Sequence, residues 1–203
     1  MTQTTNDRQE TLAVPSGSVS IVGIGGIGSW AALMASKAGF EVHVYDGDTV
    51  SETDLHRTPY QVSHIGQLKT DALAGLLGYP MHSAAHIGHL GTHAQWNKSI
   101  AAHYFLTDWV IAAVDSYKVR LDLYRWAKKI SAVYIDAGCE GHGAQVSDSP
   151  ALVGDDEPGY RITPQWAGPN IFAAVMAVSR MVYRTRGTIL LDKGEVNVLC
   201  HTK

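Results

Sequence analysis

The sequence lacks several features that mark particular classes of protein. It has two cysteines in 203 residues, Cys139 and Cys200, too few for a disulfide framework or a zinc ribbon, so we expect no zinc and a reducing, cytoplasmic setting. The formal net charge of -3 lacks the basic excess that proteins use to bind nucleic acids or membrane surfaces. No apolar run is long enough to span a bilayer. We therefore expect a protein that contacts neither nucleic acid nor membrane.

Hydrophobic patterning divides the chain into alternating strands and helices. It predicts strands at 19–22, 41–45, 81–85, 109–114, 132–137, 143–146, 188–191 and 195–199, and helices at 27–38, 67–77, 100–105, 116–129 and 170–184. This alternation favours an α/β, Rossmann-like fold, with a mostly parallel sheet, helices on both faces and short antiparallel strands near the C-terminus. We predict an N-terminal arm over residues 1–17 and one domain over residues 18–203.

A glycine-rich turn follows the first predicted strand. The run GIGGIGS, from Gly23 to Ser29, stands where a helix begins, and there glycine lets the backbone approach a phosphate or ribose closely. Asp46 ends the second strand and is placed to accept hydrogen bonds from ribose hydroxyls. On these two features alone, a nicotinamide dinucleotide fits as well as ATP.

Two cationic residues after the second strand favour ATP over a dinucleotide. A dinucleotide site has no need of Arg57 and Lys69 in this segment, whereas each of them offsets the charge of a triphosphate. The signature GxxxxGK[ST] is missing, so the predicted phosphate site is not a P-loop.

Four motifs in this order resemble the ThiF, MoeB and ubiquitin-activating family. They are GxGGxGS at 23–29, DxDxVxxxxLxR at 46–57, IGQxK at 65–69, and an aspartate after the fourth strand in VDSYKVR at 114–120. The resemblance covers roughly residues 19–146. It implies an adenylyltransferase that uses ATP and Mg²⁺ to convert a carboxylate into an acyl adenylate with release of pyrophosphate. It also implies a homodimer, with the helix at 170–183 as a candidate contact surface. The implied substrate is the C-terminal glycine of a ubiquitin-like or sulfur-carrier protein, or a peptide or small acid.

The resemblance also implies roles for individual residues. Arg57 and Lys69 would bind phosphates, and Asp115 would hold Mg²⁺ and help to place the attacking carboxylate. Arg8 would reach the ATP of a partner subunit. The remaining residues implied to line the nucleotide are Gly25, Gly26, Ile27, Asp46, Asp48, Asp54, Gln67 and Ser116. From the residues alone, the alternative for Asp115 is the N-cap of the following helix.

Departures from the family pattern keep other hypotheses open. The family usually has asparagine at the position of Asp54, and an acid there repels phosphate unless a metal or a proton intervenes. The paired CxxC motifs are absent, and the loop at 147–164 has no cysteine, which excludes thioester transfer through that loop. We interpret Cys139 as a buried structural cysteine. An NAD-dependent oxidoreductase and a non-catalytic nucleotide-binding scaffold therefore remain the alternatives.

Overall fold

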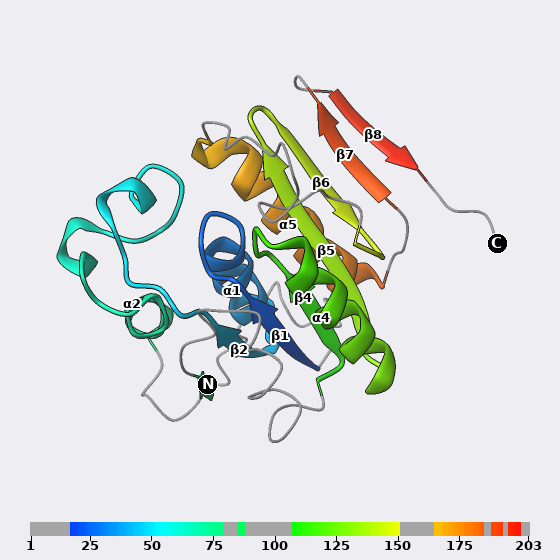
Figure 1. Cartoon of the computed structure of the whole chain (residues 1–203), viewed down its shortest axis with the longest axis horizontal. Helices are drawn as coiled ribbons and strands as arrows, with labels where there is room; N and C mark the ends of the chain where they lie inside the picture. The colour runs from blue at the N-terminus through cyan, green and yellow to red at the C-terminus, as the bar shows by residue number, and fades with distance from the viewer. Residues whose placement is uncertain are drawn as a thin grey trace, which may run out of the picture.

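An eight-stranded sheet forms the centre of the computed structural model, which describes residues 17–78, 85–87, 107–150, 165–184, 188–192 and 195–199. Its strand order is β3-β2-β1-β4-β5-β6-β7-β8 (Figure 1). The strands are β1 (Ser18–Val22), β2 (Glu41–Tyr45), β3 (Ala85–Ile87), β4 (Trp109–Ala112), β5 (Val133–Glu140), β6 (Gly143–Ser147), β7 (Thr188–Asp192) and β8 (Glu195–Leu199). The first five pair in parallel, and β6, β7 and β8 continue the sheet in antiparallel pairs.

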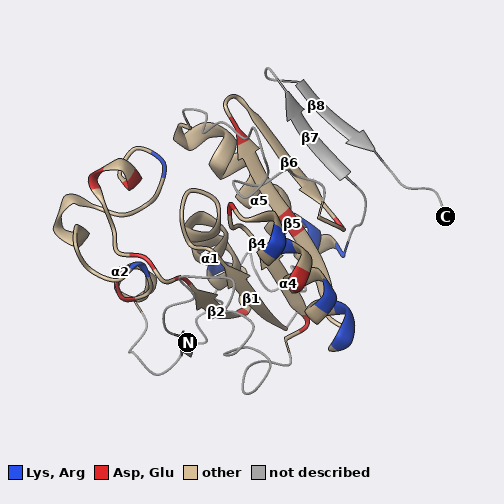
Figure 2. Ribbon diagram, viewed as in Figure 1, with Lys and Arg blue, Asp and Glu red and all other residues tan. Residues whose placement is uncertain are grey.

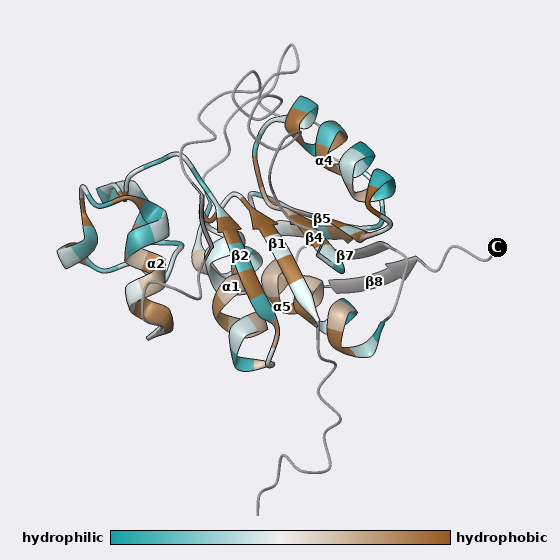
Figure 3. Cartoon of the chain, turned by 90° about the horizontal axis from the view of Figure 1, so that it is seen from below, coloured by the Kyte–Doolittle hydropathy of each residue, from teal (hydrophilic) through white to brown (hydrophobic). Residues whose placement is uncertain are grey.

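Helices cover both faces of this sheet. The helices α1 (Gly28–Lys37) and α5 (Ala167–Tyr183) lie on one face, and α4 (Tyr117–Lys129) lies on the other (Figure 3). The helix α2 (Lys69–Leu77) packs beside α1. Two buried apolar clusters result, one between the sheet and the α1–α5 pair and one beneath α4. This arrangement confirms the predicted α/β fold.

Residue size explains how α1 and α5 come together. Both helices turn alanines towards their shared interface and the sheet, and these are fully buried: Ala31, Ala32, Ala35, Ala173, Ala174 and Ala177. Small side chains let the helix backbones approach, so α5 lies close to the beginning of α1. The parallel strands beneath them are buried on both faces, and for this reason they read as continuous apolar runs such as the WVIA of β4.

Several predicted boundaries differ from the observed ones. The last long helix begins at Ala167, before the predicted start, because a proline at position 169 is tolerated in the first turn of a helix. The helix α2 begins at Lys69, because Leu68 pairs with Thr49 in an isolated β-bridge instead. The third strand is described at Ala85–Ile87 and shares Ala85 with the predicted range of 81–85, of which residues 81–84 lie outside the described part of the chain.

Some predictions fall on parts of the chain that the structure does not describe. The helix expected at 100–105 lies outside the described residues, as does the N-terminal arm apart from position 17. Within the described ranges, no helix combines the length and the apolar character needed to cross a bilayer.

Candidate functional site

The candidate site lies at the carboxyl ends of β1 and β4, where the order of the strands in the sheet reverses. From β1 the chain builds outward to β2 and β3, whereas β4 starts again on the other side of β1 and leads to β5. The connections after β1 and β4 lead to α1 and α4 on opposite faces of the sheet, and open α/β sheets bind their ligands at such a point. The glycine turn follows β1, and residues 113–116 follow β4, so both segments lie at this edge of the sheet.

The glycines of the turn have different functions. The φ angle of Gly23 is +81°, which strongly favours glycine, and its N–H donates a 2.8 Å hydrogen bond to the carbonyl oxygen of Tyr45. A Cβ atom on Gly26 would lie 2.5 Å from the amide oxygen of Asn170 in α5, so this glycine permits close packing. A Cβ on Gly25 would meet no atom within 4 Å. Gly25 therefore faces open space, as the predicted nucleotide contact requires. The side chain of Ile27, also predicted to line the nucleotide, is buried in the core.

Asp46 connects the glycine turn to the segment after β2. One carboxylate oxygen accepts a 2.8 Å hydrogen bond from the N–H of Ile24, and the other accepts one of 2.8 Å from the N–H of Asp48. Burial raises the pKa of Asp46, and the positive charge of Lys69 and the two backbone donors offset part of that rise. Because each carboxylate oxygen has two lone pairs, both oxygens keep an acceptor position for a hydroxyl group.

Side chains that sequence reasoning missed hold the next segment against the glycine turn. Tyr60 donates a 2.8 Å hydrogen bond to the carbonyl oxygen of Ile24, and the indole N–H of Trp30 donates one of 3.0 Å to the carbonyl oxygen of Arg57. These contacts place the backbone of Arg57 beside α1. Neither aromatic residue stands in one of the four motifs, so no sequence signal distinguished them from core residues.

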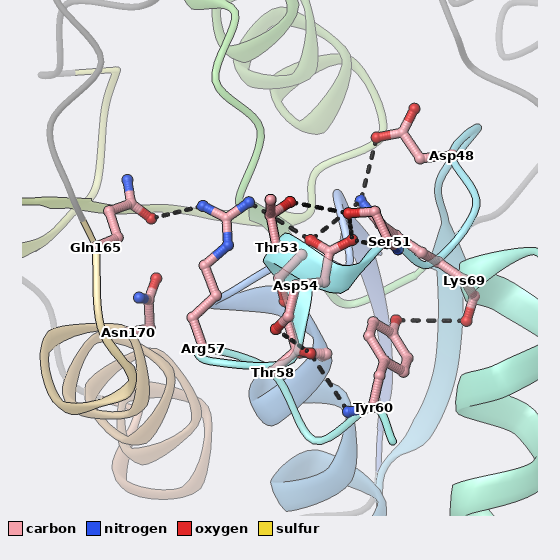
Figure 4. A network of polar contacts seen from close by, with 12 residues as sticks. Asp48, Ser51, Thr53, Asp54, Arg57, Thr58, Tyr60, Lys69, Gln165 and Asn170 are labelled. Carbon is pink, nitrogen blue, oxygen red and sulfur yellow. Dashed lines mark hydrogen bonds and ion pairs between the residues drawn. The ribbon is translucent and has the colours of Figure 1, made fainter. Parts of the chain in front are cut away.

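The two predicted phosphate-binding cations converge on one carboxylate, that of Asp54. A single oxygen of Asp54 lies 3.5 Å from a guanidinium nitrogen of Arg57 and 4.0 Å from the ammonium nitrogen of Lys69 (Figure 4). The ammonium group also lies 3.1 Å from the exposed carboxylate of Asp48. Acidic and basic residues thus share the segment between β2 and α2 (Figure 2). The structure therefore brings Arg57 and Lys69 together although they are separated in sequence.

Asp54 is not a free negative charge facing solvent. Its side chain is buried, and its second oxygen accepts hydrogen bonds from the backbone N–H of Ser51 at 3.0 Å and from its hydroxyl at 2.9 Å. Burial on its own would raise the pKa of Asp54, but the Ser51 hydrogen bonds and the charges of Lys69 and Arg57 outweigh it and leave the pKa below its ordinary value. The carboxylate is therefore an anion held between two cations.

Arg57 is also held from the opposite side, by Gln165. The Gln165 side-chain oxygen accepts a 3.1 Å hydrogen bond from Arg57, and its amide nitrogen donates one of 3.2 Å to the carbonyl oxygen of Cys139 in β5. Gln165 stands just before α5 and joins the start of that helix to the sheet and to the site. Sequence reasoning missed this residue, because nothing in its neighbourhood along the chain marks it.

Asp115 and Ser116 lie in the segment that follows β4. The hydroxyl of Ser116 accepts a 3.3 Å hydrogen bond from the N–H of Val119, so Ser116 is the N-cap of α4 and the capping role considered for Asp115 does not apply. Asp115 is exposed just beyond β4. Among the described residues, no ion pair joins it to Arg57 or Lys69.

Two other predicted residues stand apart from this convergence. Gln67 is exposed, and its amide nitrogen donates a 2.9 Å hydrogen bond to the carbonyl oxygen of Ser63, within its own loop. Arg8 lies outside the described residues.

The residues at this edge of the sheet fit a magnesium–nucleotide complex. Gly25 leaves open space beside the turn, and the Nε atom of Arg57 is buried without a hydrogen-bond partner in the described part of the chain. The exposed carboxylate of Asp115 is one hard oxygen ligand, and Mg²⁺ in nucleotide sites is held by one or two carboxylates together with phosphate oxygens. Within the described residues, no cluster of three or more His, Cys, Asp or Glu side chains is arranged to hold a metal ion by itself.

Comparison with known proteins places the chain among related sequences and folds. The ThiF family model matches residues 3–160. Ubiquitin-like modifier-activating enzyme 5 of Arabidopsis thaliana is 29% identical over 136 residues, and its counterpart of Oryza sativa subsp. japonica is 27% identical over 138 residues. Both matches cover 60% of this chain and 32% of the relative. The chain thus spans about a third of the length of these plant proteins.

Solved structures of the same fold include MccB in complex with ATP and in complex with MccA. The crystal structure of E. coli MccB with ATP superposes with a TM-score of 0.70 at 15% identity, covering 90% of this chain and 62% of that one. The microcin C7 biosynthetic enzyme MccB with N-formylated MccA has a TM-score of 0.70 at 17% identity, covering 90% of this chain and 63% of that one. At these identities the likeness establishes a common fold.

Proposed function

The chain belongs to the ThiF family, and we propose that it uses ATP to adenylate a carboxylate, giving an acyl adenylate and pyrophosphate. The observation that carries this proposal is the convergence of Arg57 and Lys69 on one oxygen of Asp54, near the glycine turn that Tyr60 and Asp46 tie to the same segment. Two cations near a turn that leaves open space at Gly25 suit the triphosphate of ATP better than the less charged pyrophosphate of a dinucleotide.

Each residue of the site has a role that its surroundings support. Asp46 accepts hydrogen bonds from ribose hydroxyls, and the backbone at Gly25 lies against the nucleotide. Arg57 and Lys69 bind phosphate oxygens and stabilise the negative charge that develops on them. Asp115 binds the hard cation and orients the substrate carboxylate. The chain needs no general base, because a carboxylate is already ionised at neutral pH. When bound, ATP would supply the α-phosphorus that the carboxylate attacks and the pyrophosphate that leaves, and Mg²⁺, held by Asp115, would offset the negative charge of the phosphates.

The substrate class follows from the relatives. The plant relatives are named for ubiquitin-like modifiers, and MccB is solved with N-formylated MccA, so we propose a carboxylate presented by a small carrier protein or a peptide. We also propose a homodimer in which α5 contributes to the contact, since Val175 on this helix is 41% exposed and Tyr183 is 74% exposed. Sedimentation of the full chain at several concentrations tests the dimer.

Exchange of radiolabelled pyrophosphate into ATP tests the reaction. A panel of carriers and peptides that end in a free carboxylate should support exchange, and the same panel with amidated C-termini should not. Asp115→Asn should lower the exchange rate by about 100-fold. The melting temperature should stay unchanged, because the Asp115 side chain is exposed and Ser116, not Asp115, is the N-cap of α4. Glu52→Gln removes an exposed carboxylate from the other side of the site and serves as the control. Exchange by Asp115→Asn at the wild-type rate would remove the role proposed for this aspartate.

Ligand-induced stabilisation separates the alternatives. ATP with Mg²⁺ should raise the melting temperature and NAD should not, since a ligand that binds only the native state stabilises it. Stabilisation by NAD alone would favour the oxidoreductase hypothesis. Stabilisation by ATP without pyrophosphate exchange for any carboxylate would favour a nucleotide-binding scaffold.

A further inference from the structure

Hydrogen bonds within its own turn fix the side chain of Asp54. It ends the short 3-10 helix Glu52–Asp54, and both the N–H and the hydroxyl of Ser51 donate to one of its oxygens. The side chain is 4% exposed. Its position is therefore fixed by the local backbone, independently of any ligand.

The other oxygen of Asp54 faces the two phosphate-binding cations. Arg57 approaches it at 3.5 Å and Lys69 at 4.0 Å, both longer than the ion pair of 3.1 Å between Lys69 and Asp48. These three ion pairs join Arg57 and Lys69 to the carboxylates of Asp54 and Asp48. The four side chains together have no net charge. A polyphosphate that binds Arg57 and Lys69 must also approach the carboxylate of Asp54, which water screens little because it is buried.

We propose that Asp54 makes the site selective for the Mg²⁺ complex of a nucleotide over the free nucleotide. This inference rests on the proposed function and assigns a specificity-determining role to the residue that replaces the asparagine typical of the family. The repulsion between a fixed anion and a ligand is proportional to the charge of the ligand, and free ATP has roughly twice the negative charge of its Mg²⁺ complex. Asp54 therefore weakens the binding of free ATP more than that of the complex. Arg57 and Lys69 remain correctly spaced because the same carboxylate pairs with both.

The matched variant is Asp54→Asn. It keeps the shape of the side chain and an oxygen that accepts from Ser51, and it removes the charge. The dissociation constant of ATP is measured by calorimetry twice for each protein, once with excess Mg²⁺ and once with EDTA. In the wild type, the complex should bind more tightly than free ATP. In Asp54→Asn, free ATP should gain more affinity than the complex does, so that the ratio of the two constants falls by about tenfold. A purely structural role would change both constants by the same factor.

Glu52→Gln is the control for net charge. It removes a carboxylate from the same turn, but that carboxylate is exposed and screened, so the ratio should stay at the wild-type value. If Asp54→Asn fails to fold, Asp54→Ser, which also removes the charge and keeps an acceptor near Ser51, is compared in the same way.

The outcomes distinguish this inference from the function on which it rests. A wild-type chain that binds ATP in neither condition overturns both. A wild-type chain that binds the complex, together with an uncharged variant that keeps the wild-type ratio, overturns the selectivity of Asp54 and leaves the proposed function in place.

Discussion

The phenol oxygen of Tyr60 lies 2.8 Å from the carbonyl oxygen of Ile24, so the segment after β2 is bonded to the glycine turn through a side chain. The same hydroxyl lies 3.4 Å from the carbonyl oxygen of Lys69. Burial, and secondarily the charges of Asp46 and Asp54, raise the pKa of Tyr60, so the hydroxyl keeps its proton and donates throughout the physiological range. One neutral donor thus links the turn to the start of α2.

We expect Tyr60→Phe to weaken this link without creating a cavity in the core. The ring stays, and the loss of a buried hydrogen bond should lower the free energy of unfolding by about 1 kcal/mol, measured in urea. The affinity for ATP should fall by about threefold to tenfold, because Arg57 and Lys69 then lie less firmly beside the turn. Tyr124→Phe is the control, since the Tyr124 hydroxyl on α4 makes no hydrogen bond within the described residues and its ring packs on Tyr134, away from this link. Equal stability of Tyr60→Phe and wild type would show that the hydrogen bond contributes nothing net.

Gly25→Ala and Gly26→Ala form a matched pair with opposite expected outcomes. A methyl group at 25 meets no protein atom within 4 Å, so this variant should fold with a wild-type melting temperature and lose affinity for ATP by at least about tenfold, because the methyl group occupies ligand space. A methyl group at 26 would come within 2.5 Å of Asn170, which is buried and bonded to the carbonyl oxygen of Trp166. This variant should lose about 1–3 kcal/mol of stability through overpacking.

The melting temperature and ATP affinity of both variants are measured together. An affinity loss at position 26 with unchanged stability would assign that glycine to the ligand and not to packing. Wild-type affinity in Gly25→Ala would place the nucleotide elsewhere.

Cys139 should react slowly with alkylating reagents in the native protein. Burial raises the pKa of its thiol to about 11, although Arg57 nearby acts in the opposite direction. The thiolate is the reactive form, so at pH 8 iodoacetamide should modify Cys139 about 100-fold more slowly than an exposed cysteine. The rate should increase about tenfold per pH unit up to about pH 10. The experiment uses Cys200→Ser, so that Cys139 alone reacts. A fast reaction at pH 7 would reopen a nucleophilic role for this thiol.

The parts of the fold that local sequence determines were predictable. Periodicity and backbone freedom predict the first strand, the glycine turn, the helix that follows and an acid after β2, and the predicted parallel sheet is confirmed. The sequence also indicated that Arg57 and Lys69 act together, because both stand in motifs that flank one loop. Their exact partner was not predictable. The sequence predicts that Asp54 repels phosphate, but it does not show that the turn at 51–54 buries this carboxylate between the two cations.

Contacts between distant segments were missed for a physical reason. Gln165 reaches Arg57, and Asn170 packs on Gly26, only because α5 returns across the sheet beside α1. The residues at 165–170 contain no pattern that predicts this packing, because the close approach depends on the missing side chain of the glycine at position 26. The glycine motif predicts a ligand contact at that position, and the sequence contains no feature that distinguishes a ligand contact from helix packing.

Arg120 is another residue whose contacts with a distant segment could not be predicted from the sequence. It stands in the motif VDSYKVR, yet its guanidinium group is buried, 2.9 Å from the carboxylate of Asp136 in β5 and 3.1 Å from the carbonyl oxygen of Ala137. Tyr134 donates a 2.7 Å hydrogen bond to the same carboxylate oxygen. This group joins α4 to the sheet just behind Asp115, and we infer that it is structural.

Removing one partner of this buried pair should cost far more than removing both. Arg120→Met leaves Asp136 as a buried charge with only the hydroxyl of Tyr134, so the free energy of unfolding should fall by about 3–5 kcal/mol. Arg120→Met combined with Asp136→Leu leaves no buried charge and should recover most of that loss, because apolar residues of similar size replace such pairs at little cost. Denaturant unfolding of the two single variants and the double variant measures the coupling. Single-variant losses that simply add in the double variant would mean that Arg120 and Asp136 stabilise the protein independently.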